Sequence, residues 1–104
     1  MEIKMNIKEK IISAIKTRKK VELNYKREGN RLVCPHALYI SPTGKTLVDG
    51  YQLAGYSSHS EQIPGWRPFD ISKITDLKVL DEAFELAHGY NPHSDRYLKV
   101  IVKV

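Results

Sequence analysis

The chain has 104 residues, of which 41% are hydrophobic and 28% are charged. These values fit one globular domain of ordinary composition and exclude a wholly disordered chain. No run approaches about 18 uninterrupted apolar residues, so we expect no membrane span and no membrane partner. Seventeen Lys and Arg residues against twelve Asp and Glu residues leave a net charge of +5. This charge either attracts polyanions such as nucleic acid or only keeps a small domain soluble.

The first predicted element is an amphipathic helix over about residues 7–18. Ile11 and Ile15 are four residues apart and therefore share one face with the other isoleucines of this segment. Asn6, followed three residues later by Glu9, is typical of a capping arrangement. The lysine-rich opposite face is either a solvated surface or a phosphate-contact surface.

Three short strands are predicted next, at residues 21–25, 31–40 and 46–54. Pro35 interrupts the second of them and cannot donate a hydrogen bond to a neighbouring strand. That strand is therefore either an edge or contains a bulge. Gly50 in the third strand marks a possible bulge or bend of the kind that a small curved barrel requires.

The rest of the chain predicts a loop followed by short elements. Residues 55–65 are rich in Ser, His, Gly and Pro and are expected to form the loop, after which Trp66 begins an extended run. A short helical turn is expected at residues 71–74, and one or two helical turns are expected at residues 81–88. Alternating apolar and polar residues predict a terminal strand at residues 97–104.

One helix followed by five or six short strands predicts a mainly β fold, a small barrel rather than a layered α/β architecture. We expect a single domain over residues 1–104, with the barrel at about residues 20–86. The turns between the strands are short and hairpin-like, and no internal repeat is present.

Signatures of enzymes and cofactor sites are missing from the sequence. It contains no glycine-rich phosphate loop, no nucleophile elbow and no His-Glu-x-x-His motif, so we expect no catalytic residue and no enzyme activity. Cys34 and His36 would share a strand face if no bulge intervenes, but the histidines and the cysteine do not form two pairs at zinc-ligand spacing. We expect no metal and no other cofactor. Because Cys34 is the single cysteine, an internal disulfide is excluded, which fits a reducing cytoplasm.

Aromatic and basic residues are interleaved along the chain. Trp66 precedes Arg67, and Tyr25 precedes two further cations. Exposed rings can stack on bases while neighbouring cations neutralise phosphates. The alternative is that these rings form the barrel core. The strand alternation favours the core for Tyr25 and Phe69, whereas both interpretations remain open for Trp66 and Arg67, and also for Tyr51.

After the leading helix, three segments and a later Phe84 follow in a recognisable order. The segments are residues 21–25 (Val-Glu-Leu-Asn-Tyr), 31–35 (Arg-Leu-Val-Cys-Pro) and 67–74 (Arg-Pro-Phe-Asp-Ile-Ser-Lys-Ile). This order resembles that of the WYL domain over roughly residues 7–86. The last segment is similar to the family's Arg-x-Phe-x-Leu-Asp-Arg-Ile stretch, with Lys73 where the family prefers arginine. Thr46, Leu47 and Val48 stand where the family carries its Trp-Tyr-Leu signature.

The resemblance implies an Sm-like, SH3-type β-barrel that acts as a sensory module in bacterial transcription or defence regulation. Family relatives typically carry an N-terminal helix-turn-helix, whereas only about six residues precede the first helix here. One helix does not supply a two-helix DNA reader, so we expect a detached sensor or one that acts beside a separate DNA-binding regulator. The basic pocket of the family carries over to Tyr25, Arg31, His36, Tyr51, Arg67 and Lys73.

Two functional hypotheses follow. The first is a non-enzymatic module that binds a short single-stranded nucleic acid or a nucleotide. Arg31, Arg67 and Lys73 would contact phosphate, His36 and Tyr51 would line the pocket, and Trp66 or a tyrosine would stack on a base. The second is a protein-interaction module that forms a homodimer when strand 97–104 pairs with an edge of a second copy. The alternative for that strand is closure of its own barrel.

Overall fold

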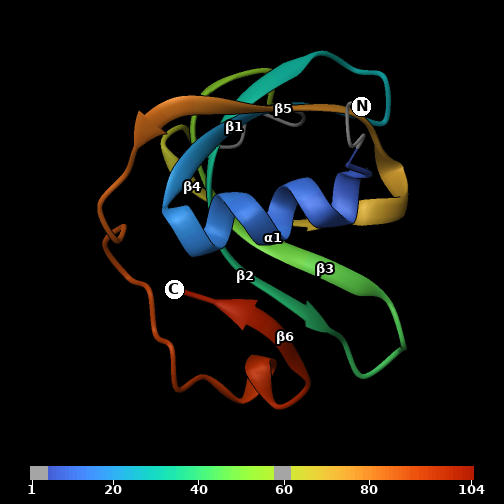
Figure 1. Cartoon of the computed structure of the whole chain (residues 1–104), viewed down its shortest axis with the longest axis vertical. Coiled ribbons are helices and arrows are strands. Elements are labelled where there is room, and N and C mark those ends of the chain that lie inside the picture. The colour runs from blue at the N-terminus through green and yellow to red at the C-terminus, as the bar shows by residue number, and fades with distance from the viewer. Residues whose placement is uncertain (1–4, 58–61) are drawn as a thin grey trace.

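The computed structural model describes residues 5–57 and 62–104 (Figure 1). Its elements are α1 (Ile7–Thr17), β1 (Lys19–Tyr25), β2 (Asn30–Ile40), β3 (Thr46–Gly55), β4 (Gly65–Asp70), the 3₁₀ turn η1 (Ile71–Lys73), β5 (Ile74–Ala83), the 3₁₀ turn η2 (Asp95–Tyr97) and β6 (Val100–Lys103). The strands form one antiparallel sheet in the order β4-β3-β2-β1-β5, and β6 pairs with β2. The predicted fold class, mainly β with an N-terminal helix, is confirmed. The bent sheet is not closed, since no pairing joins β4 to β5 in the described residues.

Helix α1 forms where the sequence predicts it. The side chain of Asn6 accepts a hydrogen bond from the Glu9 amide at 2.8 Å, and the Glu9 carboxylate accepts one from the Asn6 amide at 3.1 Å. This reciprocal capping box satisfies backbone donors that the first turn leaves free. The helix ends at Thr17, and the C-cap residue Arg18 has a left-handed φ of 52°. Ile11 and Ile15 on its inner face pack against the sheet and form the main core with apolar side chains of β1, β2 and β5.

Strand β2 is the centre of the sheet and contains a bulge. It pairs with β3 along one edge, and with β1 and then β6 along the other. The register with β3 shifts between Pro35 and Ala37, so that His36 is the extra residue. The predicted bulge is confirmed, and the alternative of an edge strand is wrong. Gly50 lies opposite Pro35, and a Cβ added there would lie 2.3 Å from the side chain of Val33, so the close approach of the strands requires glycine.

The helical turns predicted at residues 81–88 are wrong. Residues 81–83 continue β5, which pairs with β1 as far as the Lys19–Ala83 pair. Ion pairs across the two strands join Lys19 to Asp81 at 3.3 Å and Lys20 to Glu82 at 3.2 Å. The ladder to β1 satisfies the backbone over a long sequence separation, and it overrides the local preference that favoured a helix. The short turn expected at residues 71–74 is confirmed as η1.

The terminal strand is shorter than predicted, because β6 begins only at Val100. Residues 95–97 form η2 instead, and Tyr97 is buried there. Strand β6 pairs with β2 of the same chain, with Val102 opposite Leu38. It therefore has a partner within the chain, although this pairing does not close a barrel. The loop predicted at residues 55–65 is shorter than expected, because Gly55 belongs to β3 and Gly65 belongs to β4. Its positions 58–61 lie outside the described residues.

Both faces of β2 are covered, and this arrangement positions the candidate site. One face packs on the core beneath α1. On the other side, Ala37 and Tyr39 pack with Tyr97 in a second apolar cluster. Residues 84–99, orange to red in Figure 1, leave the end of β5, pass around the side of the sheet and return to β6. The second cluster therefore joins the sheet to this returning segment.

Candidate ligand-binding site

A cavity of about 360 Å³ lies between the sheet and the returning segment. Strands β3 and β4 supply one side of it, and the residues between Gly89 and Tyr97 supply the other. The cavity therefore exists only because a segment distant in sequence packs against the sheet. Its lining residues are Asp49, Trp66, Arg67, Pro68, Gly89, Tyr90, Asn91, Ser94, Arg96 and Tyr97.

Three aromatic rings form the wall of the cavity. The rings of Trp66 and Tyr90 are stacked, with centroids 6.1 Å apart and planes inclined by 26°, and Tyr90 contacts Tyr97 at 6.3 Å. The indole N–H of Trp66 donates a hydrogen bond to the carbonyl of His88 at 2.9 Å. These contacts hold aromatic rings from the sheet and from the returning segment together in one wall.

His36 packs against the rings of this wall but does not line the cavity. Its side chain is fully buried, and its ring lies 4.8 Å from the ring of Trp66 and 5.0 Å from that of Tyr90. Nδ1 lies 2.8 Å from the carbonyl oxygen of Cys34, and Nε2 accepts a hydrogen bond from the Ala87 amide at 3.0 Å. These partners assign a neutral ring with its proton on Nδ1. Burial lowers the pKa of His36, against the opposing effect of the Cys34 carbonyl.

A buried carboxylate lies at one side of the cavity. Asp49 Oδ1 accepts hydrogen bonds from the Tyr39 hydroxyl at 2.8 Å and from the Arg96 guanidinium at 3.0 Å. Asp49 Oδ2 accepts one from the Tyr97 hydroxyl at 2.8 Å. Burial, together with this bond to Asp49, raises the pKa of Tyr97, so the hydroxyl remains a donor. The network holds Arg96 at the cavity, although 55% of its side chain is exposed.

Arg67 is the second cation of the cavity. Its guanidinium donates hydrogen bonds to the carbonyl of Trp66 at 2.9 Å and to that of Gln62 at 2.8 Å. With Arg96 and Asp49, the cavity carries two positive charges and one negative charge. A partly enclosed space with an aromatic wall and a net positive charge suits a planar ligand that carries an anionic group.

A different cluster surrounds Arg31, and it is closed. Only 4% of Arg31 is exposed, and its guanidinium lies 5.4 Å from the ring centres of Tyr25 and Tyr56 and 5.6 Å from that of Phe69. It also donates a hydrogen bond to Gln52 at 3.4 Å. Phe69 belongs to the main core, as its strand alternation predicts. In this cluster the arginine is packed inside the protein.

The structure distributes the seven predicted site residues over several places. Trp66 and Arg67 line the cavity. Tyr51 contacts the Trp66 ring edge-on at 5.4 Å, and His36 lies beneath it. Tyr25 and Arg31 share the closed cluster described above. Lys73 is exposed on η1.

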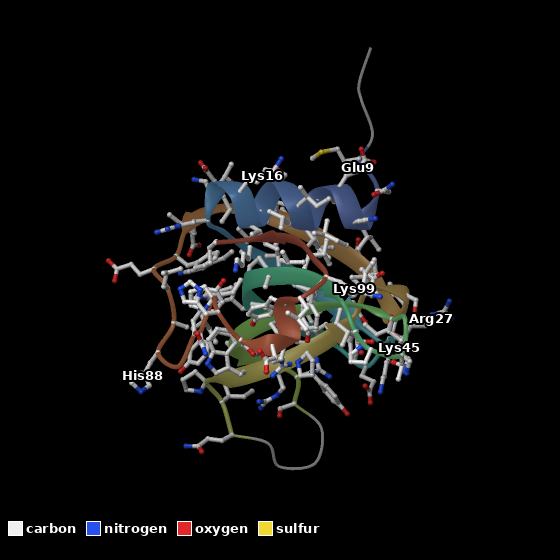
Figure 2. The ribbon with its side chains drawn as sticks, turned by 90° about the horizontal axis from the view of Figure 1, so that it is seen from below. Glu9, Lys16, Arg27, Lys45, His88 and Lys99 are labelled. Atoms are coloured by element: carbon white, nitrogen blue, oxygen red, sulfur yellow. The ribbon has the colours of Figure 1, made fainter. Side chains whose placement is uncertain are left out.

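The three predicted phosphate contacts are Arg31, Arg67 and Lys73. They do not meet in this cavity, since only Arg67 lines it. Figure 2 shows His88, the partner of Trp66, and Arg27, in the turn before β2, on opposite sides of the molecule. The part that each predicted residue plays in binding stays a prediction.

Sequence reasoning missed four residues of the aromatic wall and the charged network of the cavity: Asp49, Tyr90, Arg96 and Tyr97. A signal existed for all of them except Tyr90. Asp49 is an acidic residue at a position within a predicted strand, directly before Gly50. Arg96 precedes Tyr97 just as Arg67 follows Trp66, so it is a further pair of arginine and aromatic residue. Tyr90 carries no comparable signal, because only the packing of the returning segment brings it to Trp66.

Within residues 5–57 and 62–104, no group of three or more His, Cys, Asp and Glu side chains is placed to hold a metal ion. No helix in this part of the chain is long and apolar enough to cross a membrane.

Comparison with known proteins finds a similar fold in one solved structure. No protein-family model and no curated protein matches the sequence. The solved structure is Proteasome accessory factor B/C (PafBC) of Arthrobacter aurescens, which matches with a TM-score of 0.63 at 20% sequence identity. The match covers 80% of this chain but only 13% of that chain, so this domain corresponds to a small part of it. The likeness shows that this chain shares the fold of that part of PafBC.

Proposed function

We propose that this domain is a non-enzymatic regulatory module that binds a short single-stranded nucleic acid or a nucleotide in the cavity. The observation that carries the proposal is the meeting of three aromatic rings and two arginines in one cavity of a protein with a net charge of +5. PafBC is a WYL-domain-containing transcriptional regulator, and its similarity supports a regulatory role at a coarse level.

The cavity can bind such a ligand through two kinds of contact. A base that stacks on Trp66 or Tyr90 gains roughly 1–3 kcal/mol, and this contact tolerates any base. A guanidinium can hold a phosphate through two parallel hydrogen bonds, which an ammonium cannot do. Asp49 limits the positive charge of the cavity, since it forms an ion pair with Arg96. These contacts favour one nucleotide unit in the cavity.

The protein carries its own probe for this binding, because Trp66 is its single tryptophan and lies in the cavity wall. Titration with short single-stranded oligonucleotides and with mononucleotides should quench the Trp66 fluorescence. Affinity should fall steeply with salt, because phosphate neutralisation releases counterions. Arg67→Ala should weaken binding by roughly tenfold, equivalent to the loss of about 1.4 kcal/mol.

Lys73→Ala supplies the matched control, because Lys73 is a cation that does not line the cavity. This variant should leave the affinity within about twofold of the wild type. Equal losses in the two variants would show that diffuse surface charge, and not the cavity, attracts the ligand. If no nucleotide or oligonucleotide quenches the fluorescence at low salt, the proposed function is wrong.

A further inference from the structure

We propose that two copies of this chain form a dimer through an apolar groove beside the β2–β3 turn. The groove has a volume of about 610 Å³ and lies between that turn and the residues that join η2 to β6. It is separate from the ligand cavity but shares Arg96 with it. The groove is lined by Tyr39, Ile40, Ser41, Pro42, Leu47, Asp95, Arg96, Leu98 and Lys99.

Exposed apolar side chains are concentrated at this groove. Leu98 is 84% exposed, the largest value among the large hydrophobic residues of the described chain. Ile40 is exposed in the groove as well, and Val100 and Ile101 continue the exposed apolar surface onto β6. Together these are four of the seven exposed large hydrophobic side chains in the described part, although they come from only two short segments. Such a patch marks an interaction surface.

The charges around the groove decide the kind of partner. Arg96 is paired with Asp49, and the remaining charges of the lining are those of Asp95 and Lys99. Asp49 lies outside the groove, but its ion pair with Arg96 leaves Asp95 and Lys99 as the two unpaired charges of the lining, one acid and one base, although the whole chain carries +5. A polyanion or an anionic membrane would select a basic surface instead. A surface with one acid and one base beside apolar residues is complementary to itself, because a twofold axis can place each acid opposite a base.

A dimer through the groove is favoured over a dimer through the β6 edges. In an antiparallel pair of β6 strands centred on Ile101, Lys99 of one copy would lie opposite Lys103 of the other. Like charges that lie directly opposite each other destabilise a strand pair. In the groove, by contrast, Leu98 of each copy can insert beside Ile40 and Leu47 of its partner. This contact buries the most exposed apolar side chain of the chain.

The mass of the protein in solution tests the proposal without any ligand, so it is independent of the proposed function. Analytical ultracentrifugation of the wild type at about 100 µM should show a dimer, since an affinity in the micromolar range suffices at that concentration. Leu98→Asp should reduce the dimer fraction by at least roughly tenfold at the same concentration. Circular dichroism should show an unchanged fold, because Leu98 is exposed.

Leu86→Asp is the matched control, since Leu86 is also an exposed leucine but does not line the groove. It should leave the dimer intact. A wild type that remains monomeric at about 100 µM overturns the proposal, and the groove then faces a different protein. Equal loss of the dimer in both leucine variants also overturns it, because the effect would then not depend on the groove.

Charge reversal tests the twofold arrangement. Asp95→Lys and Lys99→Asp should each weaken the dimer by several-fold, because each places like charges opposite each other. The double variant should restore the dimer, since it exchanges the two charges. If neither single reversal changes the dimer fraction, the proposed orientation of the two copies is wrong.

Discussion

The two arginine–aromatic clusters of this protein use the same residue types for different purposes. Around Arg31, three rings close over the guanidinium, and only 4% of the residue is exposed. Around Arg67 and Arg96, three rings leave a cavity of about 360 Å³. Both clusters also contain hydrogen-bond acceptors that hold the arginine, a Gln52 oxygen in the first and Asp49 in the second.

The difference between the clusters lies in what covers them. The side chain of Arg31 is enclosed by residues of β1 and β4 and by Tyr56 just after β3. The second cluster faces the returning segment, whose backbone at Gly89 allows a close approach to Trp66, since a Cβ added there would lie 3.2 Å from the indole nitrogen. A cation beside aromatic rings is therefore a candidate site only where the packing leaves space for a ligand.

The largest effect that separates the clusters is expected from Arg31→Ala. This change removes a buried side chain, leaves a cavity between three rings and deprives Gln52 of its donor. The free energy of unfolding should fall by about 3 kcal/mol. Lys73→Ala, at an exposed cation of the same predicted set, should change it by less than about 0.5 kcal/mol. Urea unfolding of both variants measures the difference, and equal values would contradict a structural role for Arg31.

The next effect concerns His36, which is buried beneath the aromatic wall of the cavity. Because the pKa of His36 is lowered in the folded state, this ring stays neutral while the unfolded chain takes up a proton. The free energy of unfolding should therefore fall as the pH drops below about 6.5, by up to about 1.4 kcal/mol per pH unit. His36→Gln should remove this contribution. Unfolding of wild type and variant at a series of pH values gives the difference.

The opposite sign would be informative as well. If the wild type gains stability relative to His36→Gln on acidification, the ring is protonated in the folded protein. The assignment of a neutral ring between the Cys34 carbonyl and the Ala87 amide would then be wrong. The wall above it would also carry a further positive charge next to Trp66.

Local signals predict a large part of the fold. The helix follows from the spacing of its isoleucines and from the Asn6–Glu9 capping box, which both act within a few residues. Pro35 predicts an edge strand or a bulge in β2, because the missing N–H cannot join a ladder, and the structure contains the bulge. The end of β5 is different. Residues 81–83 are strand because they pair with β1, some 60 positions earlier, and no local pattern reports that pairing.

The candidate site is less predictable for the same reason. Trp66–Arg67 and Tyr25 with its neighbouring cations are equivalent patterns in the sequence, yet they have different fates. Trp66 and Arg67 line a cavity, whereas Tyr25 belongs to the closed cluster around Arg31 and its neighbours Lys26 and Arg27 are exposed. Arg67 lines the cavity because the segment after β5 folds back onto the sheet. Arg31 is buried because rings from β1, from β4 and from the residues after β3 meet around it. Both outcomes depend on contacts between segments that are distant in the sequence, which no local pattern reports.

The smallest effect is expected at Trp66, in the aromatic wall of the cavity. Trp66→Phe removes the hydrogen bond to the His88 carbonyl but keeps an aromatic ring beside Tyr90. The free energy of unfolding should fall by about 1 kcal/mol, which is the net value of one hydrogen bond. Thermal or urea unfolding followed by circular dichroism measures it, because the variant contains no tryptophan. If Trp66→Phe destabilises the protein as strongly as Arg31→Ala, the wall is part of the core, and the contrast between a closed and an open cluster does not hold.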